Sequence, residues 1–211
     1  MKKTLLYLPF VLLLAGAFIS CEEVEEVGEY DNWRERNEAF VDSLKAVAGN
    51  NYVATPEAAD AMEIGKLYAI QNLNAGTNVS AQYIYCKKLV ANTEGDRPMG
   101  GSGYNDEVST YYYGTLINGE KFDGNFTGYT ALDKNIPNPP QQWPTDFDSP
   151  TTFGVTDVIT GWTWALYFMH SGERWQVFIP QQSAYGTSDS GSIPGYSTLC
   201  FDMILEKVYS E

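Results

Sequence analysis

The sequence is poor in the residues on which several kinds of chemistry depend. It has a single histidine, His170, and only three cysteines among its 211 residues. A catalytic triad that relies on histidine, or a zinc site, needs more such groups within reach of one another. Basic residues are also few, with 13 Lys and Arg against 27 Asp and Glu, so the net charge is −14. Because phosphate backbones are bound by clustered Lys and Arg, we expect no nucleic acid partner. We find no metal or cofactor motif and expect neither.

Long apolar runs are also scarce, and the clearest lies at the start of the chain. Lys2 and Lys3 precede an uncharged run from Leu5 to Phe18. A membrane-spanning helix needs about 20 apolar residues, so this run is too short to be one and is typical of a secretory signal. We therefore predict a signal peptide over residues 1–20. The residues before Cys21 resemble a bacterial lipobox, so we predict lipidation of Cys21 and attachment to the outer membrane, on its periplasmic or cell-surface side.

The segment after this cysteine is strongly acidic. Residues 21–30 include Glu22, Glu23, Glu25 and Glu26, and we interpret them as a linker behind the lipidated cysteine. One interpretation is a solvated spacer that keeps the domain away from the bilayer. The other is a signal for surface export, because such runs resemble those of Bacteroidetes lipoproteins.

Only Cys86 and Cys200 remain beyond Cys21. In an exported protein the two can form a disulfide. Both lie in apolar, strand-like runs, which favours two buried free thiols equally well, and the sequence leaves both possibilities open.

Residues 31–79 are predicted to form a helical N-terminal extension. Trp33, Phe40, Leu44 and Val47 recur at helical spacing within residues 31–48, so this helix has an apolar face. We expect that face either to form a dimer interface or to pack on the rest of the protein. Pro56 indicates a second helix start that would end near Gly65, whereas residues 66–79 are ambiguous.

From residue 80 the pattern changes to strands rich in Tyr, Ile, Val and Phe. We predict strands over 82–90, 108–113, 175–179 and 197–208, with a short helix over 163–170 and His170 in an exposed loop. Residues 135–150 contain five prolines and are predicted to form a loop, whose role the sequence leaves open. Aromatic residues make up 14% of the chain, enough to line an apolar pocket.

Several motifs in this second part follow one another in a fixed order. They are Tyr111-Tyr112-Tyr113-Gly114-Thr115-Leu116, Asn118-Gly119-Glu120-Lys121-Phe122-Asp123, Val158-Ile159-Thr160-Gly161-Trp162, Ile179-Pro180, Ala184-Tyr185-Gly186, Ile193-Pro194 and Leu199-Cys200-Phe201-Asp202. Together they resemble the FKBP family of peptidyl-prolyl cis-trans isomerases over residues 80–211. The resemblance implies an α+β fold, in which an antiparallel half-barrel sheet wraps around a short helix.

The resemblance also implies a site and its roles. Catalytic positions would be Tyr112, Asp123 and Tyr185, with the Tyr185 hydroxyl donating to a substrate carbonyl. Trp162 would form the floor beneath the proline ring, and the backbone amide of Ile193 would contact a second carbonyl. The implied substrate-binding residues are Phe122, Val158, Ile159, Trp162, Ile193 and Phe201. The implied partners are proline-containing polypeptides.

Isomerisation of an X–Pro bond fits a sequence in which His and Cys, common nucleophiles and metal ligands, are scarce. Rotation about an X–Pro bond faces a barrier of about 18–20 kcal/mol, and no bond is broken. An apolar pocket disfavours the polar planar amide relative to the twisted one. The chain departs from the family pattern at Gly195, where a second proline is common, and around Thr151. A non-catalytic binding module on the same scaffold is therefore the alternative, and a glycan-binding lipoprotein is a third hypothesis based only on Tyr and Trp.

Overall fold

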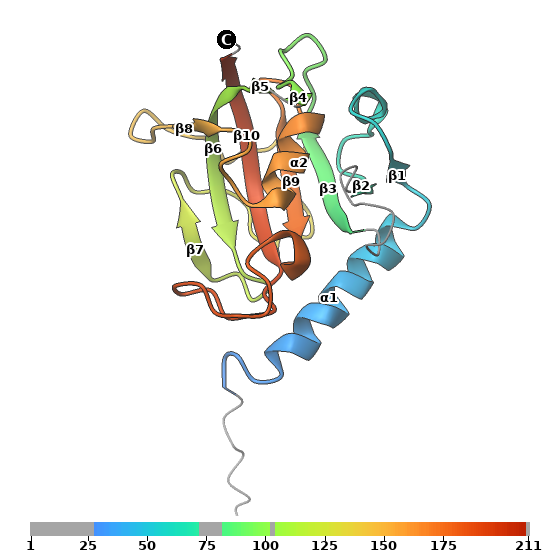
Figure 1. Ribbon diagram of the computed structural model, residues 1–211, viewed down its shortest axis with the longest axis vertical. Coiled ribbons are helices and arrows are strands. Elements are labelled where there is room, and N and C mark those ends of the chain that lie inside the picture. Colours follow the sequence, from blue (N-terminus) through green and yellow to red (C-terminus); the bar gives the residue numbers. More distant parts are fainter. Residues whose placement is uncertain (1–27, 72–81, 102–103, 210–211) are drawn as a thin grey trace, which may run out of the picture. The chain divides into compact units, whose positions relative to one another are not determined.

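The computed structural model describes residues 28–71, 82–101 and 104–209 (Figure 1). The chain divides into two compact units, residues 1–31 and residues 32–211, and each helix and strand described below belongs to the second. The predicted signal peptide and Cys21 lie outside the described residues. Within the described part of the chain, no helix is both long and apolar enough to cross a membrane.

Residues 32–211 combine one large sheet with two α-helices. Helix α1 spans Trp33–Ala48 and α2 spans Thr160–Phe168. The strands are β1 (Tyr52–Val53), β2 (Leu67–Gln71), β3 (Tyr83–Val90), β6 (Glu107–Thr115), β7 (Lys121–Gly124), β8 (Thr151–Gly154), β9 (Arg174–Ile179) and β10 (Leu199–Tyr209). Strands β4 (Gly100–Gly101) and β5 (Tyr104–Asn105) form a separate small pair, and η1 (Glu57–Ala61) and η2 (Gln181–Ser183) are short 3₁₀ helices.

The main sheet has the strand order β1-β2-β3-β9-β10-β6-β7, with β8 also paired to β6. All of its pairs are antiparallel except β1 with β2, which is parallel. The predicted α+β fold is confirmed, but the sheet is mixed and open rather than purely antiparallel.

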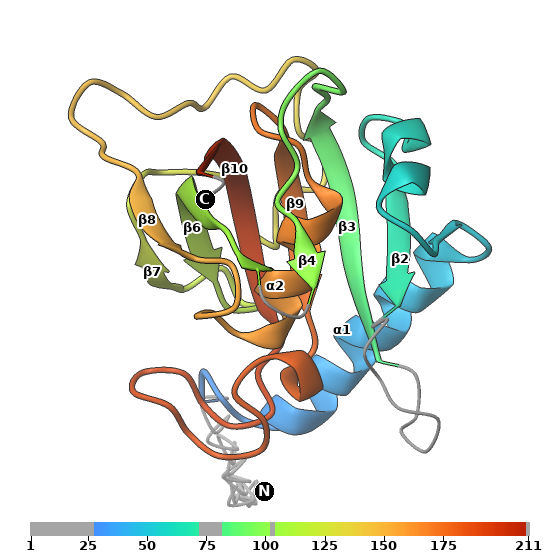
Figure 2. The same cartoon turned by 45° about the horizontal axis from the view of Figure 1, so that its top comes forward.

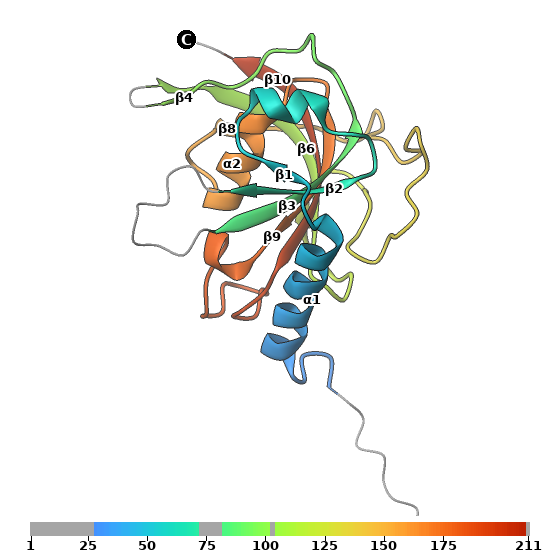
Figure 3. The ribbon, with the colours of Figure 1, turned by 90° about the vertical axis from the view of Figure 1, so that its right-hand side faces the viewer.

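Alternation along the strands separates the core into two layers, and α1 and α2 lie on different sides of the sheet (Figures 2 and 3). Successive side chains of a strand point to opposite faces of its sheet. Ile84 and Cys86 of β3 join the larger core with α2, whereas Tyr85 of β3 and Phe178 of β9 join a smaller core with Leu44 of α1. The two helices therefore cover opposite faces of the sheet.

Helix α1 is fixed to the sheet by specific contacts as well as by its apolar face. The Trp33 indole N–H donates to the Ser197 hydroxyl at 2.9 Å. The Asn37 carboxamide oxygen accepts the backbone N–H of Thr198 at 2.7 Å, and the Phe40 ring meets the Phe178 ring edge-on. The helix predicted from spacing is present, and it packs on the protein's own sheet.

The remainder of residues 31–79 differs from the helical prediction. Strands β1 and β2 lie in this range and join the main sheet. Pro56 precedes only the single 3₁₀ turn η1, not a helix that reaches Gly65. These strands were missed because β1 has two residues and β2 has five, too few to show a clear alternation.

His170 is buried, contrary to the predicted exposed loop. It is 9% exposed, and its Nδ1 lies 2.6 Å from the Gly95 carbonyl oxygen. Its Nε2 lies 3.0 Å from Asp60 and 2.7 Å from Arg97. Gly95, Asp60 and Arg97 lie far from His170 in the sequence. The residues on either side of His170 therefore gave no indication that it is buried.

The proline-rich loop 135–150 is held by a buried arginine on the α1 face. Arg174 is fully buried and forms a paired salt bridge with Asp202, at 2.8 Å and 2.5 Å. It also donates to the Gln142 carbonyl oxygen and lies 5.1 Å from the centre of the Trp143 ring. This arginine joins the loop to β9 and β10.

Candidate functional site

A cavity of about 470 Å³ opens on the α2 face of the sheet. It brings together residues from β6, β7, β8, the start of α2, the segment after η2, and β10. The lining residues are Tyr112, Asp123, Thr151, Phe153, Asp157, Val158, Ile159, Trp162, Tyr185 and Phe201. We call this cavity the aromatic pocket.

Trp162 lies at the base of the aromatic pocket, where it is 4% exposed. The rings of Tyr112 and Phe201 each stand nearly perpendicular to it, with centroids 5.1 Å away. The Phe153 ring lies at 5.4 Å. Edge-to-face packing of this kind stabilises aromatic clusters beyond their buried area, so the Trp162 side chain is locked in place before any ligand binds.

Tyr112 lies at a point along β6 where neither β7 nor β8 pairs with it, and the Asn125 side chain binds the backbone there instead. Strands β8 and β7 pair in succession with the same edge of β6, at Glu107–Thr110 and at Tyr113–Thr115. Between them, the Asn125 carboxamide oxygen accepts the Tyr112 backbone N–H at 2.8 Å, and its amide donates to the Thr110 carbonyl at 3.0 Å. Asn125 thus satisfies the backbone where no strand does and fixes the position of Tyr112.

The polar rim of the pocket is formed by a tyrosine and an aspartate. The Tyr112 hydroxyl donates to Asp123 Oδ2 at 3.1 Å, and Asp123 Oδ1 accepts the Gly124 backbone N–H at 2.7 Å. Burial, together with the negative charge of Asp123, raises the pKa of Tyr112 to about 12. Tyr112 therefore stays protonated at neutral pH and acts as a hydrogen-bond donor.

Gly114 of β6 allows the rings of Phe122 and Phe201 to approach the strand closely. A Cβ atom at Gly114 would lie 2.8 Å from both the Phe122 and the Phe201 rings. These rings meet edge-on with centroids 5.4 Å apart. Any larger residue at 114 would push apart the wall of the pocket.

Seven of the nine predicted site residues line the pocket: Tyr112, Asp123, Val158, Ile159, Trp162, Tyr185 and Phe201. Phe122 lies behind Phe201 in the same core, and Ile193 is buried in that core without lining the pocket. The backbone N–H of Ile193 donates to the Ser190 carbonyl at 3.0 Å. That amide is therefore already engaged within its own turn, unlike the role implied by the resemblance.

Three lining residues were not predicted: Thr151, Phe153 and Asp157. Phe153 supplies a ring beside Trp162 even though Thr151 and Thr152 stand in the strand before it. Thr151 and Phe153 lie in β8, whose four residues are too few to show a clear alternation in the sequence. Asp157 and Asp123 are the two charged residues of the lining, and both are acidic.

The comparison with protein families agrees with this geometry. Residues 102–206 match the model of the FKBP-type peptidyl-prolyl cis-trans isomerases. This part of the chain is an FKBP-type domain.

Curated relatives match about half of the chain. The chain is 38% identical over 101 residues to the macrophage infectivity potentiator of Trypanosoma cruzi, an alignment that covers 47% of this chain and 42% of the relative. It is 37% identical over 107 residues to the outer membrane protein MIP of Legionella longbeachae, covering 50% of this chain and 38% of the relative. The chain thus matches less than half the length of either relative.

A solved structure extends the similarity in fold beyond the FKBP-type domain. A peptidyl-prolyl cis-trans isomerase from Pseudomonas syringae superposes with a TM-score of 0.53 at 22% identity, covering 87% of this chain and 98% of that one. At this identity the similarity concerns the fold alone.

The FKBP-type domain here has its own arrangement near Gly195. The Gly195 backbone N–H donates to Asp189 at 2.8 Å, and a Cβ atom at this position would lie 2.3 Å from the Thr187 carbonyl oxygen. A proline would lack that N–H and would carry that Cβ. Glycine at 195 is therefore matched to the turn that follows Tyr185.

Proposed function

We propose that this chain is a peptidyl-prolyl cis-trans isomerase that acts on X–Pro bonds of exported polypeptides. The observation that carries the proposal is the aromatic pocket. Its base is Trp162, and a hydrogen-bonded Tyr112–Asp123 pair lies at its rim. The family match over residues 102–206 supports the same activity.

The pocket fits the physical demands of this reaction. An X–Pro bond loses its double-bond character in the twisted state, so a water-poor environment favours that state over the planar one. Trp162, Phe201 and Phe153 supply apolar surface for the proline ring. Tyr185 is 48% exposed and lines the same pocket, so its hydroxyl is free to donate to the rotating carbonyl.

Asp123 acts on Tyr112 rather than on the substrate in this proposal. By accepting a hydrogen bond from the Tyr112 hydroxyl it orients that ring against Trp162. Each 1.4 kcal/mol gained by the twisted amide over the planar amide raises the rate about tenfold. No nucleophile or metal takes part in any step.

We also propose that the chain is exported and held at the outer membrane through acyl chains on Cys21. This rests on the signal-like residues 1–20 and the acidic linker 21–30, and a relative named as an outer membrane protein supports it. Residues 31–79 and 80–211 remain our proposed division of the rest, although β1 and β2 join the shared sheet. Dimerisation through the helix stays a prediction.

The proposed activity is tested by measuring exchange of a short X–Pro peptide by NMR with the purified protein. We expect catalysis in the parent, and a loss of about tenfold in kcat/KM for Asp123→Ala and for Tyr185→Phe. Tyr209→Phe, on the distant end of β10, is the matched control and keeps the parent's rate. A folded parent that binds the peptide without accelerating exchange, whichever residue precedes proline, would instead establish the non-catalytic binding module.

A further inference from the structure

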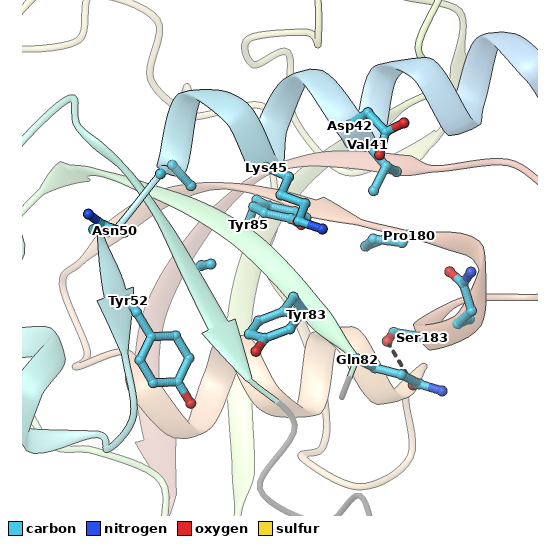
Figure 4. Close-up of a pocket in the computed structure, with 14 residues that line it drawn as sticks. Val41, Asp42, Lys45, Asn50, Tyr52, Gln82, Tyr83, Tyr85, Pro180 and Ser183 are labelled. Atoms are coloured by element: carbon cyan, nitrogen blue, oxygen red, sulfur yellow. Dashed lines mark hydrogen bonds between the residues drawn. The ribbon is translucent and has the colours of Figure 1, made fainter. Parts of the chain in front are cut away.

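A second and larger cavity, of about 900 Å³, lies on the opposite face of the sheet. It runs between the C-terminal half of α1 and the exposed faces of β2 and β3, as far as the segment that follows β9 (Figure 4). Its aromatic floor consists of Tyr52, Tyr83 and Tyr85, and Pro180 lies at its far end. We call this cavity the α1 groove.

The three tyrosines of the α1 groove form an aromatic surface whose rings are held by their neighbours. The rings of Tyr52 and Tyr83 meet nearly edge-on, with centroids 6.1 Å apart. The Tyr52 hydroxyl donates to the Gln71 side chain at 2.6 Å, which holds the outer ring. Tyr85 is only 4% exposed beneath α1. Aromatic-lined grooves of this kind are the docking surfaces for segments in the polyproline II conformation.

Several polar side chains of the groove have hydrogen-bond donors that no partner uses. Among the residues that the structure describes, the side chains of Lys45, Asn50 and Gln182 have no hydrogen-bond partner. A proline-rich chain offers carbonyl groups that no internal bond uses, and its prolines have no N–H to offer. Lys45 only donates, and the Asn50 and Gln182 carboxamides each donate and accept, so all three can bind the free carbonyl groups of such a chain.

One short segment separates the α1 groove from the aromatic pocket. Gln182 and Ser183 line the groove, and Tyr185 lines the pocket. The Ser183 carbonyl accepts the Thr160 hydroxyl at 3.2 Å, next to Ile159 of the pocket. Two residues of chain span about 7 Å at most, so a single extended polypeptide can reach both sites.

We propose that the α1 groove binds a proline-rich, polyproline II segment of a polypeptide while a neighbouring X–Pro bond occupies the aromatic pocket. The identity of the polypeptide as a substrate rests on the proposed function, but binding in the groove does not require turnover. Holding one segment in the groove raises the effective concentration of the next X–Pro bond at the pocket. Asp42 of the groove can pair with a basic residue beside the prolines, and Lys45 lies three residues along α1 from it.

The test is fluorescence anisotropy with a labelled peptide made of one lysine followed by nine prolines. We expect the purified full chain to bind it, and Tyr83→Ala to weaken binding about tenfold through the lost ring contact. Tyr83→Phe keeps the ring and is expected to bind within about threefold of the parent. The distant Tyr209→Ala should bind like the parent, and Tyr185→Ala, which changes only the pocket, should weaken binding less than Tyr83→Ala does.

Three outcomes would overturn the proposal. The first is no binding by a folded parent. The second is binding lost in Tyr185→Ala but kept in Tyr83→Ala, which places the peptide only in the aromatic pocket. The third is Tyr83-dependent binding of a glucose hexasaccharide with none of the peptide. If Tyr83→Ala does not fold, Gln182→Ala decides the matter, because it removes a donor of the groove alone and should weaken peptide binding while Tyr209→Ala does not. Peptide binding without exchange catalysis would contradict the proposed isomerase activity and leave the proposed binding in the α1 groove standing.

Discussion

At the scale of the residue, Tyr112 shows how one side chain combines a structural and a functional position. Its ring packs against Trp162, its hydroxyl donates to Asp123, and its backbone is held by Asn125. Three different elements thus determine where one hydroxyl lies. The pKa of about 12 follows from that environment, because a phenolate there would lose solvation and face the Asp123 carboxylate.

This raised pKa predicts a loss of stability at alkaline pH. An unfolded tyrosine ionises near pH 10, whereas folded Tyr112 keeps its proton up to about pH 12. Between these values the unfolded state binds fewer protons, so the free energy of unfolding falls as pH rises. We expect urea unfolding at pH 9 to 12 to show this fall more steeply in the parent than in Tyr112→Phe. An unchanging difference between the two proteins over that range would contradict the argument.

At the scale of the element, α1 is part of the folded unit rather than an appendage. Its buried Asn37 bridges two elements, since its amide donates to the Trp33 carbonyl at 2.8 Å while its oxygen accepts the Thr198 N–H. Thr198 immediately precedes β10, the strand that carries Phe201 of the pocket. The helix is therefore coupled by hydrogen bonds to the element behind the site.

Removing the Asn37 side chain is expected to destabilise the protein. Asn37→Ala leaves the buried Thr198 N–H without an acceptor, which costs about 1–3 kcal/mol of the free energy of unfolding. Val47→Ala, at a helix position that is 68% exposed, is the matched control and should change stability by less than about 0.5 kcal/mol. Urea unfolding at neutral pH measures both. Equal effects would show that α1 contributes little to the folded unit.

The elements that the sequence predicted well are those with a long repeating pattern. The spacing of Trp33, Phe40 and Leu44 predicts α1, and the tyrosine-rich runs predict β3 and β6. Order and spacing of the motifs also anticipated most of the lining of the aromatic pocket. Thr151 and Phe153 escaped because β8 has four residues, and its pairing with β6 depends on contacts far apart in the chain.

At the scale of the whole molecule, the sheet keeps the two described cysteines apart. Cys86 of β3 faces the α2 core and Cys200 of β10 faces the α1 core, with β9 between their strands. Neighbouring strands lie about 4.8 Å apart, so two strand spacings exceed the reach of a disulfide. Both are free thiols, and burial raises the pKa of each well above its usual range.

These thiols report on global unfolding. In a Cys21→Ser variant only Cys86 and Cys200 remain, and we expect neither to react with a thiol reagent until the sheet opens. Because a thiolate is the reactive form, both burial and the raised pKa protect them. The labelling rate should then follow the rate of unfolding as urea is added, and a reductant should not change the midpoint. Rapid labelling of the native protein would show that one core is open.

The edges of the main sheet carry a further consequence if the proposed function holds. At one edge β1 has two residues, and at the other β7 and β8, which both pair with β6, have four residues each. A long exposed edge offers unpaired backbone groups to which another extended chain adds as a strand, and this is a route to aggregation. Edges this short offer few unpaired backbone groups to an incoming strand, so an unfolded substrate of the proposed isomerase would find little to pair with there.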